Sequence, residues 1–162
     1  MKLVPAVREV EKIAYQNVVR KREKFYYTEM ESRMQAFVSD IVNAGYSIKG
    51  PLFYSLNNVP LDKQMDIEFF MPIVEGTFDL KGYRFSSYFV VESLIKIRVT
   101  HDFDKLTEQA YAMLLLSLEE NDLDINTPFY HILPSDGSAY IEIYLGYTDR
   151  PQEETEEGVY GF

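Results

Sequence analysis

The chain has 162 residues, of which 46% are hydrophobic and 26% are charged, as is typical of one globular domain and not of a disordered chain. It contains no cysteine, which excludes a disulfide framework, a thiolate metal site and a cysteine nucleophile. A formal net charge of −10 argues against direct binding to nucleic acid, since a phosphate backbone would be repelled.

The N-terminal segment lacks the pattern of a signal peptide, and no apolar stretch is long enough to span a membrane. We therefore expect a cytoplasmic protein with no membrane partner, which fits the absence of cysteine.

The first predicted strand covers residues 12–21, and a helix is predicted from Thr28 to Ala44. Apolar side chains recur every three or four residues along this helix, which indicates one buried face. Thr28 and Glu31 have the spacing of a capping box, and Gly45 is a typical helix stop.

Two strands follow. One opens at Pro51 and continues to Leu56, and the second covers residues 65–71 with Glu68 at its centre. Apolar and polar side chains alternate in the second strand, as expected for a strand with one buried face. Residues 78–89 connect to the next strand and extend it into a hairpin.

The same order of elements is predicted again. A strand over residues 90–100 precedes a helix from Asp104 to Glu120, with Asp104 as the N-cap and Asn121 as the stop. Residues 127–133, which include Pro128, and residues 140–145, centred on Glu142, form the last two strands.

Pro51 thus corresponds to Pro128 and Glu68 to Glu142, an offset of roughly 75 residues, longer than the period of most solenoid repeats. We predict an α+β fold of two pseudo-symmetric β-α-β-β repeats, over residues 10–75 and 88–147. The strands would form a curved antiparallel sheet with both helices packed on one face. Residues 1–147 would be a single domain, and the acidic residues 148–162 a flexible tail.

This order resembles the gyrase-inhibitor-like domain, also known as the effector-binding domain of bacterial multidrug-responsive transcription activators. The resemblance covers residues 10–147 and depends on three segments: Gly50-Pro51 with Tyr54 and Asp66-Ile67-Glu68, then Phe103 to Tyr111, then Pro128 with Ile141-Glu142-Ile143. Two positions depart from it, at His101-Asp102 and at Leu145-Gly146. The resemblance implies a stand-alone member without a DNA-binding module, and a glutamate at position 142 that faces a ligand.

Strand alternation places the aliphatic side chains of residues 65–71 and 141–145 under the helices and both glutamates on the opposite face. A carboxylate among aromatic rings attracts organic cations. We therefore predict a ligand site that contains the following residues: Glu142, Tyr140, Tyr144, Glu68, Phe70, Tyr54 and Tyr130. Tyr15 and Tyr88 are further candidates for its lining.

Alternatives remain open. Both glutamates could be solvated, and Phe70 or Phe129 could fill the cavity, which would favour a scaffold role. We expect His101 and His131 to have structural or surface roles, because they lack metal-ligand spacing, and we predict no metal or cofactor.

Three functions follow. The first is a non-catalytic protein that binds a small aromatic or cationic molecule. The second is an interaction or accessory protein that uses the fold as a scaffold, as in small proteins of bacterial toxin-associated loci, which this chain also resembles. The third is a hydrolase of strained electrophiles; relatives of that kind pair a glutamate with a tryptophan, and this chain has no tryptophan.

Overall fold

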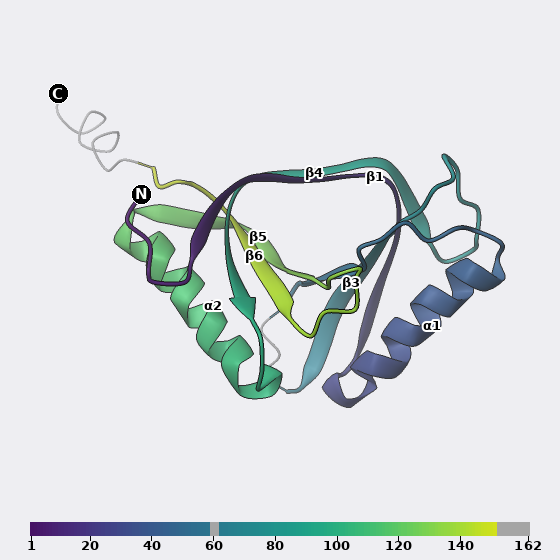
Figure 1. Ribbon diagram of the computed structural model, residues 1–162, viewed down its shortest axis with the longest axis horizontal. Helices are drawn as coiled ribbons and strands as arrows, with labels where there is room; N and C mark the ends of the chain where they lie inside the picture. Colours follow the sequence, from purple (N-terminus) through teal and green to yellow (C-terminus); the bar gives the residue numbers. More distant parts are fainter. Residues whose placement is uncertain (59–61, 152–162) are drawn as a thin grey trace, which may run out of the picture.

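The computed structural model describes residues 1–58 and 62–151. Within them, the elements run in the order β1 (Arg8–Tyr26), η1 (Tyr27–Glu29), α1 (Met30–Asn43), β2 (Phe53–Leu56), β3 (Gln64–Pro72), β4 (Arg84–Val99), α2 (Phe103–Glu120), β5 (Leu123–Ile132) and β6 (Ile141–Asp149). The predicted strand and helix order is therefore present in the structure. Figure 1 shows α2 at the left and α1 at the right of the molecule, and both pack on the outer face of the strongly curved sheet.

All strand pairs are antiparallel, and the sheet closes into a barrel with the order β1-β3-β2-β5-β6-β4. The sequence predicted a curved antiparallel sheet but not its closure. Closure depends on β1 and β4, which pair with each other from Arg8 to Arg20 and also pair with β3 and β6 respectively. In Figure 1 these two long strands cross the top of the molecule together and descend on opposite sides.

Each long strand contains one residue with a left-handed backbone, Asn17 in β1 (φ 58°) and Ser93 in β4 (φ 59°). Such a conformation is unfavourable for residues other than glycine, although asparagine tolerates it comparatively well. The carbonyl oxygen of Asn17 accepts a hydrogen bond from Ile73 N at 2.8 Å, just beyond the end of β3. This contact fixes the chain after β3 against the unusual backbone of β1.

The start of each helix differs from the prediction. A 3₁₀ turn precedes α1, and the capping residues are Tyr26 and Glu29, whose carboxylate accepts the Tyr26 N–H at 3.2 Å. The predicted pair Thr28 and Glu31 is wrong because β1 stays paired with β3 up to Tyr26, so the chain turns directly out of the strand. Gly45 does follow the helix with φ +92°, as predicted.

Helix α2 begins at Phe103, and its N-cap is Asp102, not the predicted Asp104. Asp102 has a left-handed backbone (φ 44°), and its carbonyl oxygen accepts the N–H groups of Lys105 and Leu106. At the other end Asn121 is the C-cap, as predicted, and its side chain donates to the Ser117 carbonyl oxygen at 2.7 Å.

Strand β5 begins five residues before Pro128 and does not open at that proline. The pairing of β5 with β6 shifts register between Ile125 and Phe129, and this irregularity accommodates a proline that cannot donate to the ladder. Thr127 Oγ1 accepts the Gly146 N–H at 2.8 Å, and a Cβ at position 146 would clash with Thr127. The glycine in Leu145-Gly146 is therefore required by this irregularity.

The C-terminal end of β6 extends into the segment that we predicted as a tail. Leu123 pairs with Asp149, and Arg150 forms ion pairs with Glu119 at 2.9 Å and with Asp124 at 3.0 Å. These contacts hold residues 148–150 against α2 and β5. Residues 152–162 of the predicted tail lie outside the described residues.

Candidate functional site

The two sides of the sheet differ as strand alternation predicted. Ile143 and Leu145 belong to the apolar cluster that includes Leu114 of α2, and Ile141 packs against it. Ile67 and Phe69 belong to the corresponding cluster beneath α1. The predicted orientation of the aliphatic side chains toward the helices is confirmed, so Glu68 and Glu142 have the opposite orientation, toward the barrel interior.

The barrel interior is filled by aromatic rings. Phe53 and Phe70 stack in parallel at 4.7 Å, and the Phe89 ring lies 5.4 Å and 5.0 Å from them. Tyr130 packs edge-on against Phe70 and Phe89. Phe70 is only 1% exposed, so it occupies the space where the sequence suggested a cavity. Phe129, the other residue named for this role, lies on the helix side, stacked on Tyr111 at 4.1 Å.

Glu68 is bound within this interior by Arg20 of β1. The guanidinium donates twice to the carboxylate, at 3.1 Å and 3.2 Å, and once to Ser86 Oγ at 3.1 Å. The same guanidinium lies 5.1 Å from the ring centre of Phe70, which is within cation–π range. The predicted residues Glu68, Phe70 and Tyr130 are thus brought together, but around a cation that the protein itself supplies.

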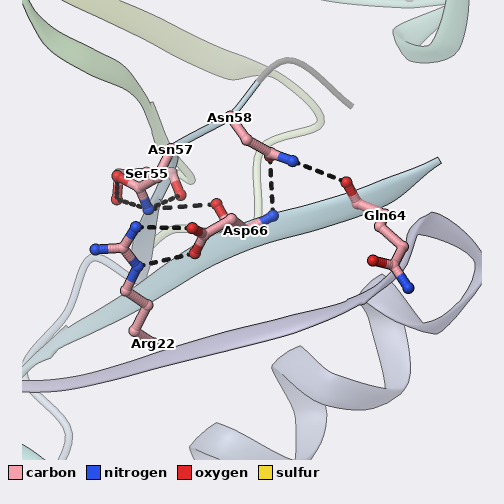
Figure 2. Close-up of polar contacts among 6 residues, drawn as sticks. All are labelled: Arg22, Ser55, Asn57, Asn58, Gln64 and Asp66. Atoms are coloured by element: carbon pink, nitrogen blue, oxygen red, sulfur yellow. Dashed lines mark hydrogen bonds and ion pairs between the residues drawn. The ribbon is translucent and has the colours of Figure 1, made fainter. Parts of the chain in front are cut away.

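Asp66 continues this row of ion pairs toward the end of the barrel. Its carboxylate accepts two hydrogen bonds from Arg22, at 2.7 Å and 2.8 Å, and these bonds lower the pKa of the Asp66 carboxyl group. Figure 2 shows that Asn57 and Asn58 enclose the backbone of Asp66: Asn57 Nδ2 donates to its carbonyl oxygen at 3.3 Å, and Asn58 Oδ1 accepts its N–H at 2.9 Å. Asp66 is therefore a structural residue.

Glu142 has two basic partners on β4. Lys96 Nζ lies 2.7 Å from one carboxylate oxygen, and Arg98 donates to the other at 3.3 Å. The Arg98 guanidinium carbon also lies 4.0 Å above the ring centre of Tyr140. Arg98 is therefore held between the carboxylate and the aromatic ring that the sequence assigned to an organic cation.

Tyr144 and Tyr15 lie close to this group. Burial raises the pKa of Tyr144 to about 12, and the Glu142 charge contributes in the same direction. Burial also raises the pKa of Tyr15 to about 12, with Tyr144 and then Glu142 as smaller causes. Both phenols consequently stay neutral at physiological pH and pack against the aromatic interior of the barrel.

Two cavities lie at this end of the barrel, on either side of Gly50 and Pro51. One has a volume of about 330 Å³ and is lined by Tyr140, Glu142 and Pro51, among others. The other, of about 320 Å³, is lined by Gly50, Tyr15 and Tyr88. Glu142 and Tyr140 thus border open space, whereas Phe70 and Tyr130 are enclosed by protein.

Tyr54 has a different location from the rest of the predicted set. It lies on the helix side, where its hydroxyl oxygen is 3.1 Å from His131 Nδ1, and the Tyr111 hydroxyl oxygen is 2.6 Å from His131 Nε2. Burial lowers the pKa of His131 to about 3, so the imidazole is neutral and links one strand of each hairpin to α2. The expected structural role of His131 fits this position.

Sequence reasoning missed the basic residues of the site. Lys96 and Arg98 were visible as the polar side chains of an alternating strand, and Arg20 as part of a short basic cluster. Their partners, however, depend on the long-range registers that place Arg98 opposite Glu142 and Arg20 opposite Phe70. A single sequence contains no signal for these registers.

In the described part of the chain, no helix is both long enough and apolar enough to cross a membrane. No curated protein sequence matches this chain significantly.

Solved structures share the fold. The C-terminal domain of EcmrR has a TM-score of 0.68 at 16% identity, over 89% of this chain and 96% of that domain. In the cryo-EM structure of the EcmrR–DNA complex the TM-score is also 0.68 at 15% identity, over 89% of this chain, which spans 57% of the EcmrR chain. A hydrolase from Listeria innocua has a TM-score of 0.55 at 11% identity, over 91% of this chain and 94% of that one. These likenesses show that the chain shares the fold of the EcmrR C-terminal domain.

One family model matches most of the chain, over residues 14–155, and its description is a domain of unknown function. The chain therefore belongs to the DUF5085 family.

Proposed function

We propose that this protein binds a small planar organic cation at the Glu142 end of the barrel and performs no chemistry on it. The observation that carries this proposal is the position of Arg98, whose guanidinium stacks on Tyr140 at 4.0 Å and donates to Glu142 at 3.3 Å. A guanidinium is itself a planar cation. The ring and the carboxylate are thus arranged to accept such a group, and Arg98 occupies the position in the free protein.

Displacement of Arg98 by a ligand is energetically feasible. Its side chain is 51% exposed, and an exposed ion pair typically contributes about 0 to 1 kcal/mol. A ligand cation on Tyr140 would regain the cation–π contact, worth roughly 0.5 to 2 kcal/mol. Lys96 would keep its contact with Glu142 at 2.7 Å throughout, so the carboxylate would never lose all its basic partners.

The cavities limit the size of the ligand. Volumes of about 330 and 320 Å³ are at the lower end of the range for small-molecule sites, roughly 300 to 1,000 Å³. The filled barrel interior gives the site a rigid floor. We therefore expect a ligand of one or two fused rings, and the fold likeness to the EcmrR C-terminal domain is compatible with such a role.

The proposal is tested by calorimetric titration with benzamidine, a planar aromatic amidinium. Glu142→Gln should weaken binding at least tenfold, whereas Arg98→Ala should strengthen it about fivefold by removal of the internal competitor. Arg8→Ala removes one positive charge from the neighbouring strand β1 and should leave the affinity unchanged. Weaker binding in Arg98→Ala, or wild-type binding in Glu142→Gln, would contradict the proposal.

A second candidate function, an interaction protein, is favoured by an exposed apolar patch on α2 and β5. Leu116 and Ile125 are about half exposed, and both line a groove of about 780 Å³ beside Arg150. If the product of a neighbouring gene covers this patch, Leu116→Glu should abolish its co-purification. Benzamidine binding should be unaffected by this substitution.

We also propose that the two β-α-β-β segments are a pseudo-symmetric repeat. If β1 is exchanged with β4, β2 with β5 and β3 with β6, every strand keeps equivalent neighbours around the barrel. The same exchange relates Asn17 to Ser93 and Glu68 to Glu142, so the two left-handed residues and the two glutamates occupy corresponding positions.

A further inference from the structure

A second cavity lies on the helix side of the sheet, where the two helices begin. It has a volume of about 560 Å³, and its walls include Tyr27 of the turn before α1, together with Phe103 and Tyr111 of α2. In Figure 1 both helices begin at the lower edge of the molecule. We call this space the helix-side cavity; it is separated by the sheet from the cavities beside Glu142.

The floor of this cavity is apolar and rigid. Leu56, Met65 and Ile141 line it, together with the Tyr54 and His131 rings, which stack at 4.6 Å. The hydrogen bonds between the His131 ring nitrogens and the hydroxyls of Tyr54 and Tyr111 hold these side chains in place. The floor therefore offers aromatic and aliphatic surface to a ligand, while its polar atoms are already paired with one another.

The rim of the cavity carries two acidic residues and one basic residue, Lys63, whose ammonium nitrogen lies 5.7 Å from the ring centre of Tyr27. Asp104 and Glu108 lie one helical turn apart on α2, and both line the cavity. Neither forms an ion pair with any residue in 1–58 or 62–151, whereas Asp66, Glu68 and Glu142 each contact an arginine or lysine. Asp104 is favoured at a helix N-terminus by the helix dipole, but Glu108 lies beyond the first turn, and two like charges at this spacing repel each other.

We propose that the helix-side cavity is a second binding site, for an amphiphilic organic cation. The aromatic body of the ligand would lie between Tyr27, Phe103 and Tyr111, and its ammonium group would meet Asp104 and Glu108. The volume falls within the usual range for one small molecule. A cation here would compete only with Lys63 for the Tyr27 ring, and it would relieve the repulsion between the two carboxylates, which form no ion pair with Lys63. The sheet between the two cavities makes this site independent of the one at Glu142.

The experiment uses three probes with the same ring system and different charges: 1-naphthylmethylamine, 1-naphthylmethanol and 1-naphthoate. Calorimetric titration of the full chain should show that the amine binds at least tenfold more tightly than the alcohol, and that the carboxylate does not bind. Asp104→Asn with Glu108→Gln should weaken binding of the amine at least tenfold. Glu108→Gln alone should weaken binding of the amine about threefold. This variant keeps Asp104, the acidic residue in the first turn of α2, so the start of the helix is not changed.

Two control variants locate the probe. Glu120→Gln removes a charge at the opposite end of α2 and should leave the affinity unchanged, as should Glu142→Gln. Loss of amine binding in Glu142→Gln but not in the Asp104/Glu108 double variant would assign the probe to the barrel end and overturn this proposal. The proposal would also be overturned if the amine did not bind, or if the amine and the carboxylate bound with equal affinity. Binding of lysine-containing peptides in place of the amine would overturn it as well.

Discussion

Glu68 and Glu142 occupy corresponding positions in the two proposed repeats, yet their surroundings differ. Glu68 accepts two hydrogen bonds from a single arginine, Arg20, whose side chain is 28% exposed and lies over the rings of Phe70 and Phe89. Glu142 shares its charge between Lys96 and the more exposed Arg98, and it borders a cavity. The two glutamate side chains are almost equally buried, at 13% and 15% exposed, so the halves differ in the exposure of the arginine partner and in the presence of a cavity.

The residues on the neighbouring strand decide this difference. On β1 the arginine is enclosed by the aromatic interior and by Ser86, so its position is fixed from several sides. On β4 the arginine leans outward over Tyr140. A glutamate among aromatic rings is therefore not by itself a sign of a ligand site; the exposure of its basic partner has to be known as well.

The largest expected effect on the free energy of unfolding concerns Phe70 and Tyr144, which lie two positions after Glu68 and Glu142. Phe70→Ala should lower the free energy of unfolding by about 3 to 5 kcal/mol, because it leaves a cavity among stacked rings. Tyr144→Phe should cost less than about 1 kcal/mol, because the ring is retained and only a hydroxyl is lost. Urea unfolding monitored by circular dichroism measures both. A loss in Phe70→Ala as small as that in Tyr144→Phe would contradict the tight packing of Phe70 in the barrel interior.

The next effect concerns the seam between the halves, where His131 pairs with Tyr54. The pKa of His131 is about 3 in the folded protein, against 6.5 for the free side chain, so below pH 6.5 the unfolded chain takes up a proton that the folded protein does not. The contribution of the neutral His131 imidazole to stability is therefore complete above pH 6.5. Below that pH the free energy of unfolding falls by about 1.4 kcal/mol for each pH unit.

Urea unfolding between pH 7 and pH 5, above the range in which most carboxylates titrate, isolates this contribution. His131→Gln should be less stable at pH 7 but should show a flatter dependence on pH. The exposed His101 serves as the control, since His101→Gln should retain the wild-type slope. Parallel curves for His131→Gln and the wild type would show that His131 does not cause the acid sensitivity.

The smallest expected effect separates the two glutamates themselves. Glu68→Gln should reduce stability by about 1 to 2 kcal/mol, because Arg20 loses charge-assisted hydrogen bonds in a partly buried position. Glu142→Gln should reduce it by less than about 1 kcal/mol, since its partners are free to turn toward water. If Glu142→Gln proved the more damaging substitution, Glu142 would be the structural residue of the pair.

Much of this fold follows from local pattern. The periodicity of the helical segments, the alternation in residues 65–71 and 141–145, and the stop at Gly45 predicted the order of elements and the side of the sheet that the helices cover. Closure of the barrel did not follow from local pattern, because it depends on the pairing of β1 with β4. The paired residues Tyr15 and Phe89, for example, are 74 positions apart in the chain.

The candidate site was predicted only in part. The alternation rule placed Glu142, Tyr140 and Tyr144 on one side of the sheet, but it gave no means to see that Tyr54 belongs to the opposite side. Nor does composition reveal whether an inward-facing ring such as Phe70 closes a cavity or lines it. That outcome depends on how several side chains from different strands pack together.

The two long strands have a consequence for how the molecule comes apart. Because β1 pairs with β4, and β2 pairs with β5, both outer strands of each three-stranded half are paired with the other half. A break in the β1–β4 ladder leaves an unpaired strand edge on both halves at once. The chain should consequently lose its structure in a single cooperative step, and amide protons near Tyr15 and Phe89 should exchange with solvent only when the whole protein unfolds.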